Sequence, residues 1–558
     1  MNNSTLFVRR SPIHLLCVAA LCAAAPAALA QWSADPGNNL AIGDLANDQV
    51  QAKIKPTSDG GCYITWFDNA TGGYDVKIQR LDRQGFEQFP HNGILLADRS
   101  YSSTVDYDMV VDASDNAIVT FRDNRSGTSL VTVTKVTPSG DQPWGASGVQ
   151  PPGTTNANNP HVAVLSDGSI ASGYSVGSGF TLVRLDPTDG HVVAGPVAIS
   201  ESGRTVTLSD LQPGDNGSVI ALWVRPFTTS FLSSKYLYTQ KYDSSLTALW
   251  TPPVGYAAVP VYAPQPSTPW PTGSGTYGTQ GGSIQNGYFP TFVSDGAGGG
   301  VFGWYENAGP RNAYIQHILA DGTAKFQANG LPNAVTDSTR IRISGTVAYD
   351  RATGEYYSAS AESANPTQGN YSAFVQHFTA AGQRTFTDSG LTILPTGTGN
   401  QPSFVQVQAI AGGCVVTGID SRSATTGVVF AAGVDSESAS VTWSSLASST
   451  IETKSRLTSC NSTSGDVFMA FSGGATGSQN MYAQNVSPTG VYGNPPPMCN
   501  PDVNQDGVAD QGDVDYLINV IAGGENPTGI DADFNGDGVA DQGDVDAIIN
   551  VIAGGPCP

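Results

Sequence analysis

A tight turn is followed by a β-rich run that ends in an aromatic residue in the stretch Asp59-Gly60-Gly61-Cys62-Tyr63-Ile64-Thr65-Trp66, and this pattern is the main indication of the fold. Near Ser360 and Gly418 the run recurs without the aromatic residue. A run rich in β-branched and aromatic residues, bounded by Gly and Asp, is typical of a strand, so each copy is interpreted as the same strand of a repeat. The aromatic position is filled in the other copies by Phe121, Tyr174, Trp223, Trp304 and Phe471.

A second landmark follows the first and reads Gln79-Arg80-Leu81-Asp82, with a turn at Gly85. Degenerate copies lie around Thr134, Val183 and Ala432, and clear copies begin at Gln240, Gln316, Gln376 and Gln484. Together the landmarks define eight units with an average length of roughly 58 residues. Short strands at this period, without helical periodicity, predict an all-β, eight-bladed β-propeller with four strands in each blade.

The two ends of the repeat region predict how the ring closes. Most units continue past the second landmark into a strand such as Gly93-Ile94-Leu95-Leu96, whereas the eighth passes into Pro495-Pro496-Pro497. The strand that this unit lacks is present before the first unit, at 39–43. We therefore expect the N-terminal strand to complete the eighth blade, so that the propeller, over residues 31–493, has no open edge.

The last sixty residues contain one unit twice, because Val508–Asp515 is repeated letter for letter as Val539–Asp546. A loop of twelve residues can offer calcium oxygen ligands from positions 1, 3, 5, 7, 9 and 12. The alternative is a pair of Asp/Asn-Gly turns on an acidic surface. For two calcium ions the expected ligands are Asp502, Asn504, Asp506, the Val508 carbonyl, Asp510 and Asp513, and then Asp533, Asn535, Asp537, the Val539 carbonyl, Asp541 and Asp544.

Each loop leads directly into a short amphipathic helix, without a helix that enters the loop as in an EF-hand pair. Apolar residues at helical spacing run from Val514 to Ile521 and from Val545 to Ile552, and two glycines follow each run. This arrangement, with Asp at position 12, resembles a type I dockerin domain over residues 499–558. The resemblance implies a calcium-dependent module that binds a cohesin-like receptor. It also implies recognition residues at loop positions 10 and 11, whose identity in the two repeats would allow two binding orientations: Gln511, Gly512, Gln542 and Gly543.

Two further features resemble exported bacterial proteins. The repeat form Gly-Gly…Trp-x-Asp…Gln-Arg-Leu-Asp…Gly is similar to repeats in exported bacterial multidomain proteins. The terminal module, bracketed by cysteines and ending in Gly555-Pro556-Cys557 after a Pro-rich linker at 494–498, is similar to the planctomycete type of dockerin. Cys499 and Cys557 either form a disulfide clasp, which the internal duplication would favour, or remain free thiols.

The opening residues predict export. Arg9 and Arg10 precede an apolar run, and Ala28-Leu29-Ala30 offers a cleavage site, so residues 1–30 are expected to be a signal peptide. No later stretch is apolar enough to span a membrane. The formal charge of −22 becomes −24 without the two arginines, and the absence of a basic patch argues against nucleic acid as a partner. A secreted or cell-surface location is expected.

No catalytic motif is recognisable along the repeats. Asp68-Asn69 and Asp123-Asn124 are interpreted as turns, and the repeated aromatic residues as packing between blades. The six histidines have no ligand spacing, and His317 and His377 are predicted to be structural because they share one repeat position. The stretch 251–290 breaks the rhythm and contains Tyr256, Tyr262, Trp270, Tyr277 and Tyr288. It is interpreted as a long loop packed on the rim, and the alternative is a ligand-binding loop with Trp270 as the candidate residue.

Two classes of function follow from these features. The favoured hypothesis is a non-catalytic propeller for binding, which the dockerin docks onto a cohesin-like receptor, a scaffold or a cell surface for polysaccharide handling. The alternative is a dockerin-borne glycoside hydrolase or polysaccharide lyase with its active site on the propeller axis. A third possibility is that the terminal module anchors the protein to its own cell envelope. A pocket on the ring axis lined by two or more carboxylates would favour the enzyme, and an axis lined mostly by small and apolar residues would favour the binding protein.

Overall fold

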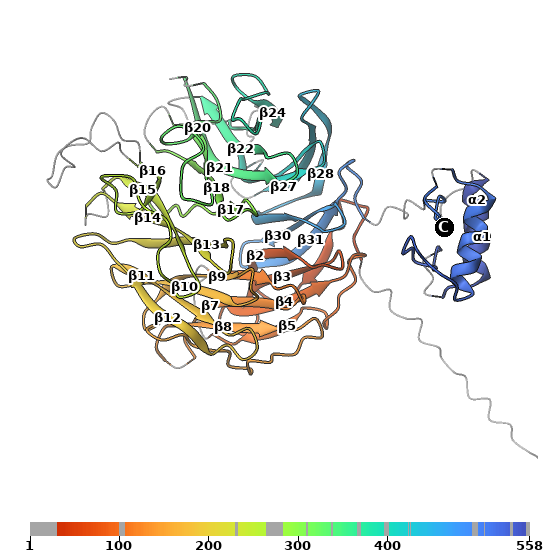
Figure 1. Ribbon diagram of the computed structural model, residues 1–558, viewed down its shortest axis with the longest axis horizontal. Coiled ribbons are helices and arrows are strands. Elements are labelled where there is room, and N and C mark those ends of the chain that lie inside the picture. The colour runs from red at the N-terminus through yellow and green to blue at the C-terminus, as the bar shows by residue number, and fades with distance from the viewer. Residues whose placement is uncertain are drawn as a thin grey trace, which may run out of the picture.

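The structure is a computed structural model and shows eight antiparallel sheets arranged as the blades of a ring, followed by two helices (Figure 1). The signal-peptide prediction, Trp270, Cys499, Asp537 and Cys557 fall outside the described residues. Among the helices of the described part, none is long and apolar enough to cross a membrane. The structure describes residues 31–99, 107–125, 127–228, 233–263, 283–307, 311–335, 337, 339–364, 370–394, 401–421, 423, 426–493, 500–506, 508–535 and 539–553.

The blades follow one another in chain order, and the first strand of each contacts the first strands of its neighbours around the centre. The first four blades are β2 Gln49–Pro56, β3 Cys62–Asp68, β4 Asp75–Leu81 and β5 Ile94–Ala97; β6 Asp108–Val111, β7 Ala117–Asp123 and β8 Leu130–Val136; β9 Asn158–Val164, β10 Ile170–Val176, β11 Gly179–Leu185 and β12 Val192–Ile199; β13 Thr207–Pro213, β14 Val219–Pro226, β15 Lys235–Tyr242 and β16 Val259–Tyr262.

The other four are β17 Phe292–Ser294, β18 Gly300–Tyr305, β19 Ala313–Ile318 and β20 Leu331–Pro332; β21 Arg340–Asp350, β22 Glu355–Ala364, β23 Ser372–Phe378 and β24 Leu391–Leu394; β25 Gln401–Ile410, β26 Gly413–Ser421, β27 Gly427–Asp435 and β28 Ser440–Glu452; and β29 Lys454–Asn461, β30 Val467–Ala475 and β31 Ser478–Val486 with the N-terminal strand β1 Leu40–Gly43. The predicted eight-bladed propeller is therefore confirmed, but the prediction of four strands in each blade is wrong for the second blade, which has three strands within the described residues.

Ring closure also occurs as predicted. Strand β1 pairs antiparallel with β31, with Leu40 opposite Ala483, so that the last sheet has the order β1-β31-β30-β29. Trp32, just before β1, stacks on Phe468 with ring centroids 5.0 Å apart, and its indole N–H donates to the Arg83 carbonyl of the first blade at 2.9 Å. The first and last blades therefore lie side by side, as the colours of Figure 1 show.

The aromatic position of the first landmark packs inside the ring. The described members of this position are all nearly inaccessible, so the prediction of packing rather than ligand binding fits their burial. Gly93 lies at φ +67°, and a Cβ there would meet the Trp66 ring at 2.8 Å and the Ile78 carbonyl at 2.4 Å. Glycine is therefore required where the chain crosses this tryptophan. Gly330 crosses Trp304 in the same way.

The glutamine of the second landmark holds the loop between the third and fourth strands. Gln79 accepts hydrogen bonds from the backbone N–H of Arg80 at 2.9 Å and of Phe89 at 3.0 Å, and its amide donates to the Phe89 and Pro90 carbonyls. Glutamine suits this position because its side-chain amide can both accept from and donate to backbone groups of a buried loop, which have no partner on a neighbouring strand. The same bonds recur at Gln240, Gln316 and Gln376.

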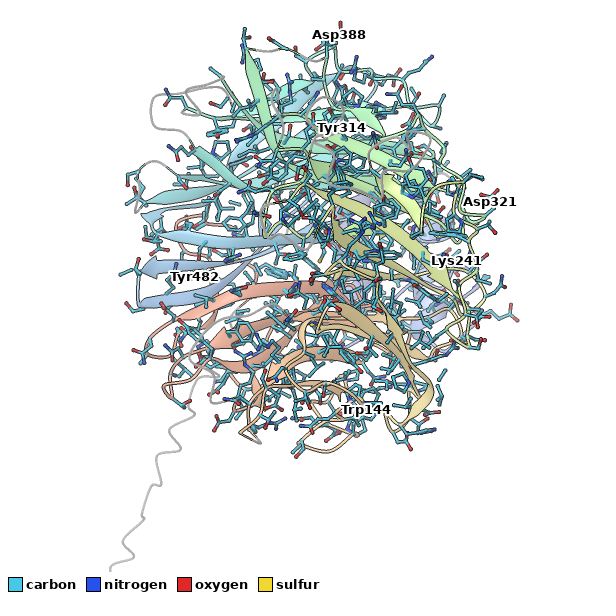
Figure 2. All side chains as sticks on the ribbon, turned by 90° about the vertical axis from the view of Figure 1, so that its left-hand side faces the viewer. Trp144, Lys241, Tyr314, Asp321, Asp388 and Tyr482 are labelled. Carbon is cyan, nitrogen blue, oxygen red and sulfur yellow. The ribbon has the colours of Figure 1, made fainter. Side chains whose placement is uncertain are left out.

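Hydrogen bonds from a tryptophan and a lysine join neighbouring blades at the loops. Trp144 and Lys241, labelled in Figure 2, belong to the second and fourth blades. The Trp144 indole donates to the Thr188 carbonyl at 3.1 Å, and Lys241 Nζ donates to the Gly298 and Ala320 carbonyls at 3.0 Å. Each bond therefore runs from one blade to the next.

Five of the innermost strands contain a bulge at one place. The pairing register shifts there, and the residue at the shift adopts positive φ, which costs free energy for a residue other than glycine. These residues are Gln51, Asn159, Ser344, Phe404 and Arg456, with φ between +45° and +62°. The bulges bend the inner strands and so reorient the side chains that follow them.

The C-terminal residues form two loop–helix units around a small common core. The helices are α1 Gln511–Ile521 and α2 Gln542–Ile552. Val514 and Leu517 of α1 are buried against Val545 and Ile548 of α2, and Val503 of the first loop joins them. The amphipathic spacing in the sequence therefore predicted both helices, but two residues of the predicted apolar faces, Ile518 and Ile549, are exposed.

Candidate functional site

The last position of each C-terminal loop is buried and turned back onto its loop. Asp513 is fully buried, and its two carboxylate oxygens accept hydrogen bonds from the backbone N–H of Asn504 at 3.0 Å and of Asp510 at 2.9 Å. Asp510 in turn caps α1 by accepting from the Gly512 N–H. The second loop repeats this arrangement with Asp544, Asn535, Asp541 and Gly543.

The donor set of the first loop consists of oxygen atoms, which fits a hard cation such as calcium. Oxygens of Asp502 and Asn504 both accept from the Asp506 N–H, at 3.1 and 2.9 Å, and Asp506 accepts from the Val508 N–H at 3.0 Å. Within the described chain, neither loop gathers three acidic side chains with oxygens within 4.8 Å of one another. The predicted calcium ligands therefore remain a prediction.

The module exposes the same residues twice. Gln511 and Gln542 are exposed, and each side-chain amide donates to an aspartate four residues later. Gly512 is exposed and Gly543 is half-buried. Large apolar side chains are also exposed in pairs, at Val508 and Val539 in the loops and at Ile518 and Ile549 on the helices.

A second candidate lies at the centre of the ring. In seven of the eight blades, one residue of the inner strand pairs with the residue just before the aromatic position, so these seven residues share one level of the propeller. We call this set the axial row. Its described members are Lys53, Asp108, His161, Asp210, Thr346, Gln406 and Thr458. Every member is polar, and the charged and titratable ones come from four consecutive blades.

Three members of the axial row converge across three blades. His161 Nδ1 lies 3.5 Å from an oxygen of Asp108 and 3.9 Å from an oxygen of Asp210. All three ligand atoms lie within 4.8 Å of one another. The side chains of His161 and Asp210 are 5% and 6% exposed, and that of Asp108 is 14% exposed. We call this group the axial cluster.

Each carboxylate of the axial cluster is also held by backbone of the next blade. Asp108 accepts from the N–H of Val162 at 3.3 Å, and Asp210 accepts from that of Phe292 at 3.0 Å. Burial raises the pKa of Asp210 above its usual range, although the His161 charge opposes this effect. Burial alone would also raise the pKa of Asp108, but His161 and Lys53 hold it at about 2. Asp108 is therefore a carboxylate at neutral pH.

The sequence analysis missed the axial cluster because the three residues are far apart along the chain and follow no ligand spacing. A signal was present, since Asp108, His161 and Asp210 occupy the same position of three consecutive units. Comparison of the repeats column by column would have found it. Asp108 and Asp210 supply two carboxylates near the axis, with the side chains of His161 and Asp210 almost inaccessible, and the axial pocket expected for an enzyme remains a prediction.

The other sequence candidates have structural surroundings. Asp68 and Asp123 accept from the N–H groups two residues later, as the turn interpretation predicts. His317 is buried, 2.7 Å from the Tyr356 hydroxyl and 3.0 Å from an Asp295 oxygen, and His377 is buried beside Thr385. Both histidines are therefore structural within the ring.

The described part of the stretch 251–290 contradicts the interpretation of a loop with exposed aromatic residues. Tyr262 lies in β16 and is buried, and Tyr256 and Tyr288 are half-buried and pack on the core of the fourth and fifth blades. The expectation of exposed aromatic residues is wrong for these three, because the stretch contributes the outer strand of the fourth blade. Among the described cysteines, Cys62, Cys414 and Cys460 form no disulfide.

The comparisons with known proteins find fold likeness at low identity. No family model matches the chain, and no curated relative matches it. The Dos1 propeller shares 12% identity and covers 82% of this chain and 95% of its own, with a TM-score of 0.43. The polysaccharide lyase Uly1 shares 10%, covers 81% and 91%, and has a TM-score of 0.39. The GH93 α-L-arabinofuranosidase of Fusarium graminearum shares 13%, covers 59% and 93%, and has a TM-score of 0.32.

Proposed function

We propose that this chain is an exported protein in which a calcium-dependent, dockerin-like module docks a propeller for binding onto a cohesin-like receptor, a scaffold or a cell surface. The observation that carries the proposal is the duplication within the module, in which two loop–helix units bury one core and expose apolar residues at equivalent places, Val508 and Val539, and Ile518 and Ile549. Polysaccharide handling is the biological setting that a dockerin implies.

Calcium would act in the proposal by joining each loop to its helix. Residues 499–558 contain twelve Asp or Glu residues and no Lys or Arg, so an ion would remove a repulsion that the small core cannot overcome by itself. Asp513 is well placed for this role, because it belongs to the loop and to the first turn of α1.

The docking face in the proposal consists of the exposed apolar pairs beside the recognition positions. Ile518 is 46% exposed and Ile549 is 47% exposed, at equivalent positions of the two helices. Exposed apolar side chains that recur at equivalent places are typical of a contact surface. Because the faces are equivalent, loss of one should leave the other able to bind.

The test is retention of the mature full-length chain on a panel of immobilised cohesin domains, with calcium and then with chelator. We expect calcium-dependent retention, weakened in the double variant Ile518→Ser, Ile549→Ser and little changed in each single variant. The matched control is Leu95→Ser, Val193→Ser, which changes two apolar residues of the propeller with 48% exposure each. Retention that ignores chelator, or equal loss in the control, would contradict the proposal.

A polysaccharide-cleaving propeller is the second candidate, favoured by the two carboxylates of the axial cluster. Soluble polysaccharides incubated with the mature chain would then yield new reducing ends, or unsaturated ends if the reaction is a lyase reaction. Cleavage that disappears in Asp108→Asn and persists in the turn variant Asp189→Asn would favour this candidate. Retention of a polysaccharide without cleavage would favour the first.

A further inference from the structure

Two groups of one histidine and two aspartates occur in the described part of the chain, and their geometry differs. In the turn between β11 and β12, His191 Nδ1 lies 2.6 Å from Asp189, with both side chains largely exposed. That distance is a direct hydrogen bond, so no atom fits between the two groups. The turn cluster, Asp186, Asp189 and His191, is thus an ordinary surface group.

The axial cluster has the wider spacing that metal ligands have. The separation of 3.9 Å between His161 Nδ1 and Asp210 exceeds that of an N–H···O hydrogen bond, and the separation of 3.5 Å from Asp108 lies at its outer limit. Ligands at 2.0–2.1 Å from one tetrahedral ion are about 3.4 Å apart, so these separations leave room for an ion between the ligands. One nitrogen thus faces two carboxylates across a gap of the size that a small cation fills.

We propose that Asp108, His161 and Asp210 bind one divalent transition metal ion of the zinc class at the axis of the ring. An imidazole nitrogen with two carboxylates suits zinc, manganese, iron or cobalt better than calcium, which prefers oxygen alone. The Asp108 side chain is 14% exposed, which gives the cluster a contact with solvent through which an ion can enter.

The backbone contacts of the cluster place the ligands before an ion binds. The backbone N–H of Val162, next to His161, donates a hydrogen bond to Asp108. The backbone N–H of Phe292 in the fifth blade donates one to Asp210. Partners of this kind around the ligands orient them and strengthen metal binding. The ion would therefore cross-link the inner strands of the second, third and fourth blades.

Lys53 supplies the competing explanation, in which no metal takes part. It stands next in the axial row, and its charge acts on Asp108 together with that of Lys55. Positive side chains and a charged imidazole could then balance the two carboxylates without an ion. The two explanations differ in whether the ring retains zinc after the calcium loops are filled.

The experiment uses the mature full-length chain, stripped with chelator, returned to excess calcium, exposed to zinc and desalted. Elemental analysis should find about one zinc ion per chain, and zinc should raise the melting temperature because it binds the folded ring alone. With cobalt in place of zinc, visible absorption should report a nitrogen and oxygen ligand set of low coordination number.

Variants distinguish zinc binding at the axial cluster from zinc binding at the exposed turn cluster. His161→Gln and Asp210→Asn should each lower zinc affinity by more than about tenfold, while His191→Gln should leave zinc binding unchanged. The wild-type measurement decides the matter even where an axial variant fails to fold. A wild-type ring without retained zinc, or equal losses in His161→Gln and His191→Gln, would overturn the metal site.

Discussion

Replacement of Ile42 by alanine tests whether β1 holds the ring closed. Ile42 is fully buried between the first and last blades, in a core that includes Trp66 and Met481. Truncation of a buried isoleucine costs about 2–5 kcal/mol, from lost transfer free energy and the cavity that remains. Because β1 is the outermost strand of the last blade, this loss should favour local opening of that blade.

Hydrogen exchange measured by mass spectrometry locates such an opening. The peptides that cover 478–486 pair with β1 and should exchange faster in Ile42→Ala by about 30-fold or more, since every 1.4 kcal/mol is a factor of ten. Peptides from the fourth blade, 207–242, should change little. The melting temperature should fall as well, because opening exposes the interior of the last blade.

The matched control is Ile451→Ala on β28, where the side chain is 69% exposed. Its effect should stay within about 0.5 kcal/mol, as for most surface substitutions. Equal effects of Ile42→Ala and Ile451→Ala, or faster exchange spread evenly around the ring, would refute closure by β1.

Three further predictions concern other parts of the chain. Gln240→Leu should lower the free energy of unfolding by about 1–3 kcal/mol in a denaturant titration, because buried loop N–H groups lose their acceptor, whereas exposed Gln383→Leu should have little effect. Burial opposes ionisation of Asp123, but hydrogen bonds from Arg125 and Thr132 lower the pKa of this carboxyl below 3.8 in the folded protein. The ionised carboxylate therefore stabilises the fold above pH 3.8, and this stabilisation is lost as the pH falls through the pKa of the folded state. Asp123→Asn should therefore destabilise the ring at neutral pH and reduce its loss of stability in acid, as thermal melts at several pH values will show. Chelator should reduce helix content in the full-length chain by circular dichroism, and the double variant Asp506→Ala, Asp537→Ala should show neither this loss nor a gain with calcium.

Most of the fold could be predicted from the repeat pattern, because strands and turns depend on residues that are neighbours in the sequence. The aromatic position of Trp66, the glutamine at Gln79 and the glycine at Gly93 all act within one blade. Ring closure was predictable by counting strands, since an unpaired edge at 39–43 and a missing strand in the last unit require each other. The two helices followed from spacing alone.

The inner bulges could not be predicted in the same way. Ser344, Phe404 and Arg456 adopt positive φ without the glycine that marks this conformation in a sequence. Packing of the ring imposes that conformation, and its cost is offset by contacts with neighbouring blades. The side chains that the bent strands turn toward the axis were therefore hidden in an otherwise regular pattern.

The number of blades, the closing strand and the duplicated C-terminal unit could be predicted from the sequence, because each depends on local order and on counting. The meeting of Asp108, His161 and Asp210, and the exposure of Ile518 and Ile549 on the two helices, became clear from the three-dimensional structure. The physical reason is curvature: closing the ring brings the first strands of consecutive blades together at the centre, and thus joins residues that are a whole repeat apart along the chain.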